Sequence, residues 1–512
     1  METETETEVE TETETEVETE TETEVETETE TEVETETETE VETETETEVE
    51  TETETEVETE TETETEAETE TQTGGGGNDV PESPTVQPNP GTIVNSETLL
   101  ASSTEAFGKN APNSAKLEVS TNSNGKRSAH FNLILEGIIH AYNQAENRDT
   151  IYIDASNQRE LNAVQVTADG TVFTRLSDKE AYLAIRTGIL SIEVPTVSFK
   201  IDEFAKRNQL NGSVRVDLAI QEVSANELGV AVHWASENGA KLIGSPFQTS
   251  IQLHGDRVSE YMTGFGNRFA KFTIPVPETV KDPSRLAAVL LRDGKVVPVP
   301  MSINDNGQAV IHTTESATIM LIERQLFFEH DPHHWASEVM QSMAFKGLIP
   351  AEDLLVQLGQ DQVTRAQFAT LIVDALGLGY RAPDHYPYID LTGNAETDRI
   401  IHIVTESGLF KGVAEDRFSP DTTISREQMI SVVMRAVNSF ALDLADQPSA
   451  NHPFIDREAV SAWAQEALQA AQDKGLIAGY SDGSIGPDKP VTLNEAAYII
   501  RNLLVKSGLT RD

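Results

Sequence analysis

Residues 388–437, YIDLTGNAETDRIIHIVTESGLFKGVAEDRFSPDTTISREQMISVVMRAV, decide how the C-terminal part of this 512-residue chain folds. Apolar residues recur there at spacings of three and four, on both sides of a loop that contains Gly412 and Pro420. This periodicity predicts two amphipathic helices joined by a loop. Ser425, with Gln428 three residues later, has the pattern of a capping box and is expected to begin the second helix.

The same pattern occurs in two further units, at a period of roughly 60 residues. The last unit is FIDREAVSAWAQEALQAAQDKGLIAGYSDGSIGPDKPVTLNEAAYIIRNLL (454–504). The first unit is FEHDPHHWASEVMQSMAFKGLIP (328–350), followed by VTRAQFATLIVDALGL (363–378). Thr364 and Thr492 are therefore expected to cap the second helices of these units.

A glycine stands near the expected end of the first helix in each unit. The three are Gly347, Gly408 and Gly475. A helix end favours a left-handed residue, and glycine adopts that conformation without steric cost. The sequence therefore predicts that each first helix stops at its glycine.

The three units resemble S-layer homology (SLH) domains. The matching features among them are an aromatic-x-Asp start, a His-Trp-Ala or Trp-Ala step, Gly-Leu-Ile and Lys-Gly turns, an x-Pro-Asp loop and a Thr-Arg-Ala-Glu-like helix start. The expected repeats are 327–380, 387–440 and 453–506. The resemblance implies an all-α, pseudo-threefold SLH trimer with polysaccharide-binding grooves between repeats. It also implies an extracellular location at the bacterial cell wall or S-layer.

The ligand implied by the resemblance is a secondary cell-wall polysaccharide, anionic and often ending in a pyruvylated amino sugar. A pyruvate carboxylate suits the paired donors of a guanidinium, and a Trp face can cover the C–H surface of a sugar. The residues carried over from the family motif as polysaccharide-binding are Arg365, Arg426, Trp335, Trp463, Asp390 and Asp456. The alternative for each residue is a structural role, since an Asp at a helix start is often only a cap.

The repeats depart from the family pattern in several places. His330 stands where the first repeat should have its Asp, and Ala395 lies near the missing Trp of the second repeat. Leu493 replaces the helix-start Arg of the third repeat. We therefore expect at most two competent grooves, which linkage along a polymer would reinforce.

The central region, 98–326, carries short runs with the alternation of β-strands. These runs are 150–155, 163–176, 189–201, 213–220 and 269–277, and the tail after residue 286 is expected to form four strands. Asp293-Gly294 and Asn306-Gly307 predict two hairpins, and Glu315-Ser316 a third connection. One amphipathic helix is expected over 130–145. The fold class expected here is mainly β and sandwich-like, of unknown role.

The N-terminal residues 1–73 are a Glu/Thr low-complexity array, and 74–97 form a Gly/Pro-rich linker. The array holds 35 of the 89 acidic residues, which leaves 54 against 36 Lys and Arg in the rest of the chain. Like charges at every second position favour an extended, disordered spacer over strand or helix. The whole chain is therefore expected to be multidomain.

Composition excludes several classes of function. Cysteine is absent, which removes disulfides and thiolate sites, and no run of apolar residues is long enough to span a bilayer. No basic cluster suggests nucleic-acid binding. The acidic and His-rich cluster at 329–334 lacks metal-ligand spacing, so neither a metal nor another cofactor is expected.

Two further interpretations concern the whole chain. No catalytic motif is present, so we expect an anchored surface or S-layer protein, with other surface proteins as further partners. The alternative is an SLH-anchored polysaccharide hydrolase whose catalytic part lies in 98–326 or upstream of Met1. No export signal follows Met1, and we expect one in an upstream part of a longer reading frame.

Overall fold

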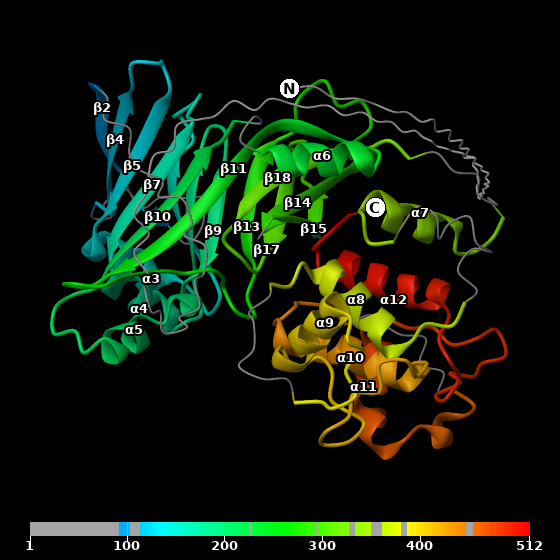
Figure 1. Cartoon of the computed structure of the whole chain (residues 1–512). Helices are drawn as coiled ribbons and strands as arrows, with labels where there is room; N and C mark the ends of the chain where they lie inside the picture. Colours follow the sequence, from blue (N-terminus) through cyan, green and yellow to red (C-terminus); the bar gives the residue numbers. More distant parts are fainter. Residues whose placement is uncertain are drawn as a thin grey trace, which may run out of the picture. The chain divides into compact units, whose positions relative to one another are not determined.

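The computed structural model describes residues 92–99, 101–102, 113–224, 228–292, 294–326, 333–349, 361–379, 387–446 and 454–511. These residues belong to one compact unit, which spans Glu82–Asp512 (Figure 1). The predicted Glu/Thr spacer and most of the linker lie outside the described residues.

Within the described residues, the strands of the central region form two sheets. The first has ten strands: β2 (Thr92–Leu99), β4 (Ala115–Thr121), β5 (Arg127–Leu133), β7 (Ala163–Asp169), β10 (Arg215–Glu222), β11 (Ala240–His254), β12 (Ser259–Tyr261), β14 (Leu286–Arg292), β15 (Lys295–Val299) and β18 (Thr318–Arg324). The second has seven: β3 (Ala101–Ser102), β6 (Thr150–Ala155), β8 (Tyr182–Thr187), β9 (Ser191–Pro195), β13 (Ala270–Pro275), β16 (Met301–Ile303) and β17 (Gln308–Thr313). The mainly-β prediction for this region is therefore confirmed.

The two sheets share one hydrophobic core. Alternate residues of β10 are buried, as the sequence predicts, and Val216, Leu218 and Ile220 are each no more than 3% exposed. Phe131 from the first sheet and Ile151 and Ile311 from the second belong to the same buried cluster. Most strand pairs are antiparallel, but β5 pairs with β7 and β6 with β8 in parallel.

Several of the predicted strands are partly helical. The run 163–176 is a strand only to Asp169, whose side chain accepts a hydrogen bond from the amide of Thr171 and caps a helix. The run 189–201 likewise leaves the sheet after Pro195. The α-helices that the structure describes in this region are α3 (Leu135–Gln144), α4 (Gly170–Ser177), α5 (Ile201–Arg207) and α6 (Gly229–Glu237).

Two other predictions for the central region need correction. The helix expected over 130–145 begins only after β5, because residues 130–133 pair with β4. The tail after residue 286 forms five strands instead of four, because the chain leaves β15 before Pro300 and enters β16 after it. Glu315-Ser316 joins β17 to β18, as predicted, and these two strands belong to different sheets. The pairs β14–β15 and β16–β17 confirm the two other turns.

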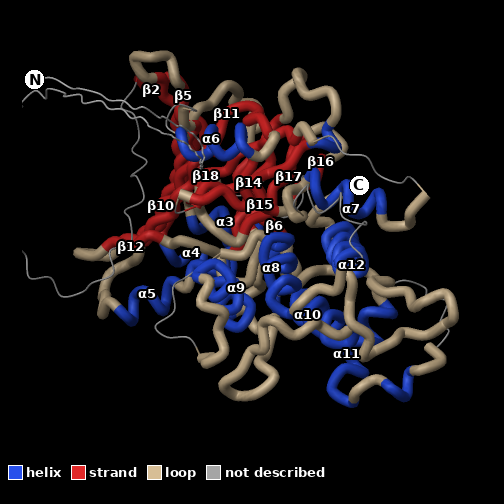
Figure 2. Tube along the Cα trace, turned by 45° about the vertical axis from the view of Figure 1, so that its right-hand side comes forward, coloured by secondary structure: helices blue, strands red, loops and turns tan. Residues whose placement is uncertain are grey.

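The C-terminal part is helical (Figure 2), and its described residues form two α-helices in each predicted repeat. They are α7 (Ser337–Phe345) and α8 (Arg365–Leu376), α9 (Ala395–Glu406) and α10 (Arg426–Ser439), and α11 (Gln465–Asp473) and α12 (Leu493–Lys506). The three predicted glycines follow the first helices, with φ of 78°, 75° and 64° at Gly347, Gly408 and Gly475. This confirms the predicted left-handed ends.

The helix starts also follow the sequence. Complete capping boxes are present at Thr364 and Ser425. In each, the cap hydroxyl accepts from the backbone amide of the third helical residue, and the side chain of that residue accepts from the backbone amide of the cap. At Thr492 the hydroxyl accepts the bond from Glu495, but the return bond is not formed. The third capping box is therefore half complete.

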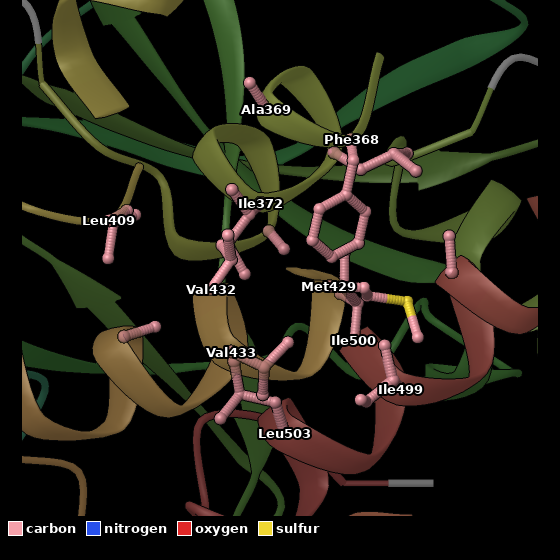
Figure 3. Close-up of a cluster of buried hydrophobic side chains, with 14 of the residues drawn as sticks. Phe368, Ala369, Ile372, Leu409, Met429, Val432, Val433, Ile499, Ile500 and Leu503 are labelled. Atoms are coloured by element: carbon pink, nitrogen blue, oxygen red, sulfur yellow. The ribbon is translucent and has the colours of Figure 1, made fainter. Parts of the chain in front are cut away.

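Side chains of α8, α10 and α12 meet in the core of the helical part (Figure 3). Phe368 and Ile372 come from α8, Val433 from α10, and Ile500 and Leu503 from α12, and all are fully buried. Each such side chain contributes about 1.5–3 kcal/mol relative to an exposed one. Packing across repeats is therefore the main source of stability of these helices.

Three segments that precede these helices form a closed ring of backbone hydrogen bonds. The amide of Val363 donates to the carbonyl of Val491 (2.9 Å), Val491 donates to Ile424 (3.1 Å), and Ile424 donates to Val363 (3.1 Å). All three side chains are buried, so these backbone groups need partners within the protein. Each repeat is thereby hydrogen-bonded to both of the others.

Helix pairing follows the same circular order. The first helix of a repeat packs against the second helix of the preceding repeat, as α9 does on α8 and α11 on α10. The first helix of the first repeat, α7, packs on α12 of the last one. The repeats are therefore interlocked.

Candidate functional site

The first residues of α8, α10 and α12 lie at three inter-repeat junctions, which we number by the repeat that supplies the helix. The amides of Arg365, Arg426 and Leu493 donate to the carbonyls of Thr422, Lys489 and Asp361, at 2.9–3.0 Å. Each of these carbonyls ends the loop of the next repeat in the circle. The family-motif Arg positions therefore face a neighbouring repeat.

The first junction holds Arg365 inside the protein. Its Nε donates to the carbonyl of Phe418 (2.9 Å) and its Nη2 to that of Lys411 (3.0 Å). The guanidinium also lies over the rings of Phe410 and Phe418, and the residue is only 4% exposed. Burial lowers the pKa of Arg365. In this position Arg365 fastens the loop of the second repeat.

The second junction places two cations around one aromatic ring. The guanidinium of Arg426 lies 4.8 Å from the ring centroid of Tyr480, and the ammonium of Lys489 lies 4.2 Å from it. Arg426 Nη1 donates to Glu495 (3.2 Å), and the Tyr480 hydroxyl donates to the same carboxylate (3.3 Å). Burial raises the pKa of Tyr480, so its hydroxyl stays protonated at neutral pH. Two positive side chains and one carboxylate thus surround Tyr480.

This use of Glu495 explains the incomplete cap of α12. A capping box needs the side chain at the third helical position to bond the backbone of the cap. In α12 that carboxylate is engaged by Arg426 and Tyr480 instead. The second junction therefore takes a group from the third repeat that would otherwise cap a helix.

Trp463 belongs to the second junction as well. It lies in the short 3-10 helix Ala462–Ala464, which packs on α10. The amide of Ser461 donates to the buried carboxylate of Glu427, next to Arg426 (3.0 Å). Trp463 remains 56% exposed, so its ring is available to a ligand.

The third junction lacks a cation at the helix start, where Leu493 stands. Trp335 forms an edge-to-face pair with Tyr498 of α12, with ring centroids 5.9 Å apart. Trp335 is 57% exposed and Tyr498 36%. This junction thus presents aromatic surface without the guanidinium.

Asp390 and Asp456 both bind backbone. The two oxygens of Asp390 accept from the amides of Phe418 (2.8 Å) and Ser419 (2.9 Å). Those of Asp456 accept from Ile485 and Gly486, both at 2.8 Å. Each carboxylate therefore holds the loop of its own repeat, and both of its oxygens are already in use.

The structure thus distributes the six predicted residues over three different places. The second junction combines Arg426 and Trp463, and Asp456 holds its loop; the first has Arg365 and Asp390; Trp335 is at the third. The sequence analysis did not identify Tyr480, Lys489, Glu495 or Tyr498. Tyr480 and Lys489 follow from aligning the loops, where they replace Val413 and Thr422 of the second repeat.

Within the described residues, no group of three or more His, Cys, Asp or Glu side chains is arranged to hold a metal ion. Part of the predicted acidic and His-rich cluster, 329–331, lies outside them. Across the same described part of the chain, no helix is long and apolar enough to cross a membrane.

Comparison with known proteins gives matches to one family. The sequence model described as S-layer homology domain matches residues 389–430 and 453–497. An endoglucanase of Bacillus sp. (strain KSM-635) is 33% identical over 146 residues, which cover 28% of this chain and 15% of that protein. Cell surface glycoprotein 1 of Acetivibrio thermocellus is 30% identical over 154 residues, covering 29% of this chain and 7% of its own.

The Surface-layer 125 kDa protein of Lysinibacillus sphaericus is 26% identical over 168 residues, which cover 32% of this chain and 14% of that protein. The chain therefore spans less than a fifth of the length of each of these three relatives. The similarity to each relative therefore covers only one segment of that protein.

Proposed function

Because residues 389–430 and 453–497 are S-layer homology repeats, we propose that the helical part anchors this chain to a bacterial cell wall without a covalent bond. S-layer homology domains anchor surface proteins in this way, and one of the relatives is itself a surface-layer protein. The location proposed for the chain is accordingly extracellular, at the cell wall or S-layer. Its central β-region would be displayed outward, where other surface proteins are further partners.

The ligand that we propose is an anionic secondary cell-wall polysaccharide carrying pyruvate. The observation that carries this proposal is the second junction, where Arg426 and Lys489 flank Tyr480. The 3-10 helix that bears the exposed Trp463 packs on α10, the helix that Arg426 begins. A pyruvate carboxylate is attracted by the two cations, and a guanidinium can donate to both of its oxygens. The indole of Trp463 offers an apolar face for the sugar that bears the carboxylate.

We propose further that the three repeats form a pseudo-threefold trimer. The ring of hydrogen bonds through Val363, Ile424 and Val491 supports this arrangement, because each segment makes the same bond to its neighbour. The three junctions have the same backbone hydrogen bond at the helix start, but their side chains differ. We therefore rank the second junction first, with Arg365 of the first junction acting mainly through the loop that it holds.

Binding of the full chain to purified wall sacculi tests the anchoring proposal. We expect retention on walls that carry their secondary polymer and release from walls stripped of it. Arg426→Ala should weaken retention about tenfold or more, because a hydrogen bond to a charged group contributes about 1.5–3 kcal/mol. Arg175→Ala is the matched control, since Arg175 is an exposed arginine of α4 outside the repeats.

Equal retention on stripped walls would contradict the proposed ligand class. Unchanged retention of Arg426→Ala would instead move the site away from the second junction. The double variant Arg365→Ala, Arg426→Ala should also be released, and its unfolding free energy must be measured because Arg365 is buried.

An anchored hydrolase remains the second candidate, favoured by the similarity to an endoglucanase over 28% of the chain. The full chain should then release sugars from wall or plant polysaccharides, and one carboxylate substitution in 98–326 should abolish turnover. Absence of turnover on both kinds of polysaccharide would leave anchoring as the function.

A further inference from the structure

The second residue of the helix that begins each junction differs in chemistry from one repeat to the next. It is Ala366 in α8, Glu427 in α10 and Asn494 in α12. All three are buried, with exposed fractions of 8%, 8% and 1%. A buried carboxylate is unfavourable unless hydrogen bonds compensate it, so the bonds of Glu427 indicate what it does.

Glu427 binds two separate segments of the third repeat. Its backbone amide donates to the carbonyl of Pro487 (2.9 Å), in the loop that carries Lys489. Its Oε2 accepts from the amide of Ser461 (3.0 Å), at the start of the short 3-10 helix that bears Trp463. One residue therefore ties both the cationic loop and the tryptophan segment to the first turn of α10.

The equivalent residues do not make the second of these bonds. The amide of Ala366 donates to the carbonyl of Pro420 (3.1 Å), but its methyl side chain accepts nothing. Asn494 has the polar atoms for such a bond, yet both are buried and neither bonds any residue that the structure describes. In the described part of the chain, this position thus holds the following repeat through a side chain only at the second junction.

We propose that Glu427 is a positioning residue of the anchoring site, which fixes Trp463 relative to Arg426. The adjacent side chains of Arg426 and Glu427 reach different segments of the third repeat, the first at Glu495 and the second at Ser461. A ligand that pairs with the guanidinium and covers the indole binds more tightly when their spacing is set beforehand, because less ordering is paid for on binding. This inference rests on the proposed anchoring function and adds a residue to its site.

The fluorescence anisotropy of Trp463 tests the proposal without any ligand. Trp234→Phe and Trp335→Phe leave Trp463 as the only tryptophan of the chain. In this background Glu427→Ala should lower the anisotropy, because the short helix loses its bond to α10 and moves more. Glu427→Gln keeps an acceptor oxygen and should restore the anisotropy.

Ser461→Pro breaks the same bond from the other side. The φ of Ser461 is −58°, which proline adopts, but proline has no amide hydrogen to donate. The variant should lower the anisotropy as Glu427→Ala does, and the two changes together should lower it no further, because both remove one bond. Ser461→Ala retains the amide and should retain the anisotropy.

Retention on wall sacculi, with the native tryptophans in place, measures the consequence for the ligand. Glu427→Ala and Ser461→Pro should each weaken retention about fivefold to tenfold, and Glu427→Gln should restore it. Asn494→Ala is the matched control, since it removes a buried polar side chain at the equivalent position. Alanine is already accommodated there in α8, so this control should change neither retention nor anisotropy.

Three results would overturn the proposal. They are an unchanged anisotropy of Trp463 in both Glu427→Ala and Ser461→Pro, an equal decrease in Asn494→Ala, and full wall retention of a Glu427→Ala variant whose anisotropy has fallen. Failure of the unaltered chain to bind walls would instead refute the anchoring function. The anisotropy would still decide whether Glu427 fixes Trp463.

Discussion

At the scale of single residues, the two motif aspartates act first on the backbone. Asp390 is partly desolvated, which opposes ionisation, but the amides of Phe418 and Ser419 lower its pKa overall. Because both oxygens of Asp390 accept from backbone amides, its carboxylate stabilises the loop at Phe418 and Ser419. It can influence a ligand only through the conformation of that loop. This separates the role of Asp390 from that of Arg426, although the family motif predicts both as polysaccharide-binding residues.

Asp390→Ala should therefore destabilise the helical part by about 1–3 kcal/mol at neutral pH, because two partly buried amides lose their acceptor. Since the folded pKa lies below the ordinary 3.8, this stability is present above about pH 4 and is lost as pH falls through the folded pKa. Urea unfolding at several pH values measures the difference, with the exposed Asp421→Ala as control. A pH-independent difference would contradict the ionic role.

Asp374 presents the opposite case. Burial raises its pKa to about 6, although the nearby Arg399 lowers it. It is the tenth residue of α8, where α10 and α12 have Arg435 and Asn502, which donate to the carbonyls of Leu409 and Leu476. An ionised aspartate has no proton to donate at this position.

Asp374→Asn should stabilise the protein by about 1–2 kcal/mol at neutral pH, because it removes a buried charge and supplies a donor. The folded state binds its proton more tightly, so the unfolding free energy of the unaltered chain falls as pH rises from about 4 to about 6. The gain of the variant should vanish below about pH 4. Chemical unfolding across this window checks the sign, and a variant less stable at neutral pH would refute the assignment.

At the scale of helices and strands, the caps link the repeats to their sequence motif. Ser425→Ala should destabilise α10 by about 0.5–2 kcal/mol, because the amide of Gln428 loses its acceptor. Thermal unfolding measures the loss, and Ser481→Ala, at an exposed loop serine, is the control. Equal effects of the two variants would show that the cap does not matter.

The sequence predicts elements well where local chemistry decides them. Helical periodicity, caps and end glycines place α7 to α12, and alternation places β6, β10 and β13. The second half of the run 163–176 was predicted wrongly, because Asp169 ends β7 and caps α4, which local alternation does not indicate. The parallel pairs and the strand change at Glu315-Ser316 depend on contacts between distant segments, which no local pattern encodes.

In the candidate site, too, the sequence predicts what local motifs decide but not the contacts between distant segments. The motif gives Arg426 and Trp463, but it does not tell that the partner of Arg426 is Glu495, sixty-nine residues away along the chain. Nor does it distinguish the buried Arg365 from Arg426, whose side chain is 11% exposed. Those differences arise from the aromatic residues of the neighbouring loop, Phe418 in one case and Tyr480 in the other.

At the scale of the whole molecule, the circular pairing of helices makes the repeats interdependent. A chain ending at Asp446 lacks α11 and α12, so α10 and α7 both lose the helix against which they pack. We expect it to lose far more helical signal than two helices account for. Far-ultraviolet circular dichroism and limited proteolysis measure this, whereas a linear array would keep its first two repeats folded.

The ring through Val363, Ile424 and Val491 also constrains how such a region can evolve. None of the three repeats is at an end of the ring, because each is hydrogen-bonded to the two others. A fourth repeat, made by duplication of one of them, would therefore find no free partner in the ring. Growth or loss is then tolerated only in whole triplets. Because α7 lies against α12, a gene rearranged to begin at its second unit would still encode the same closed assembly.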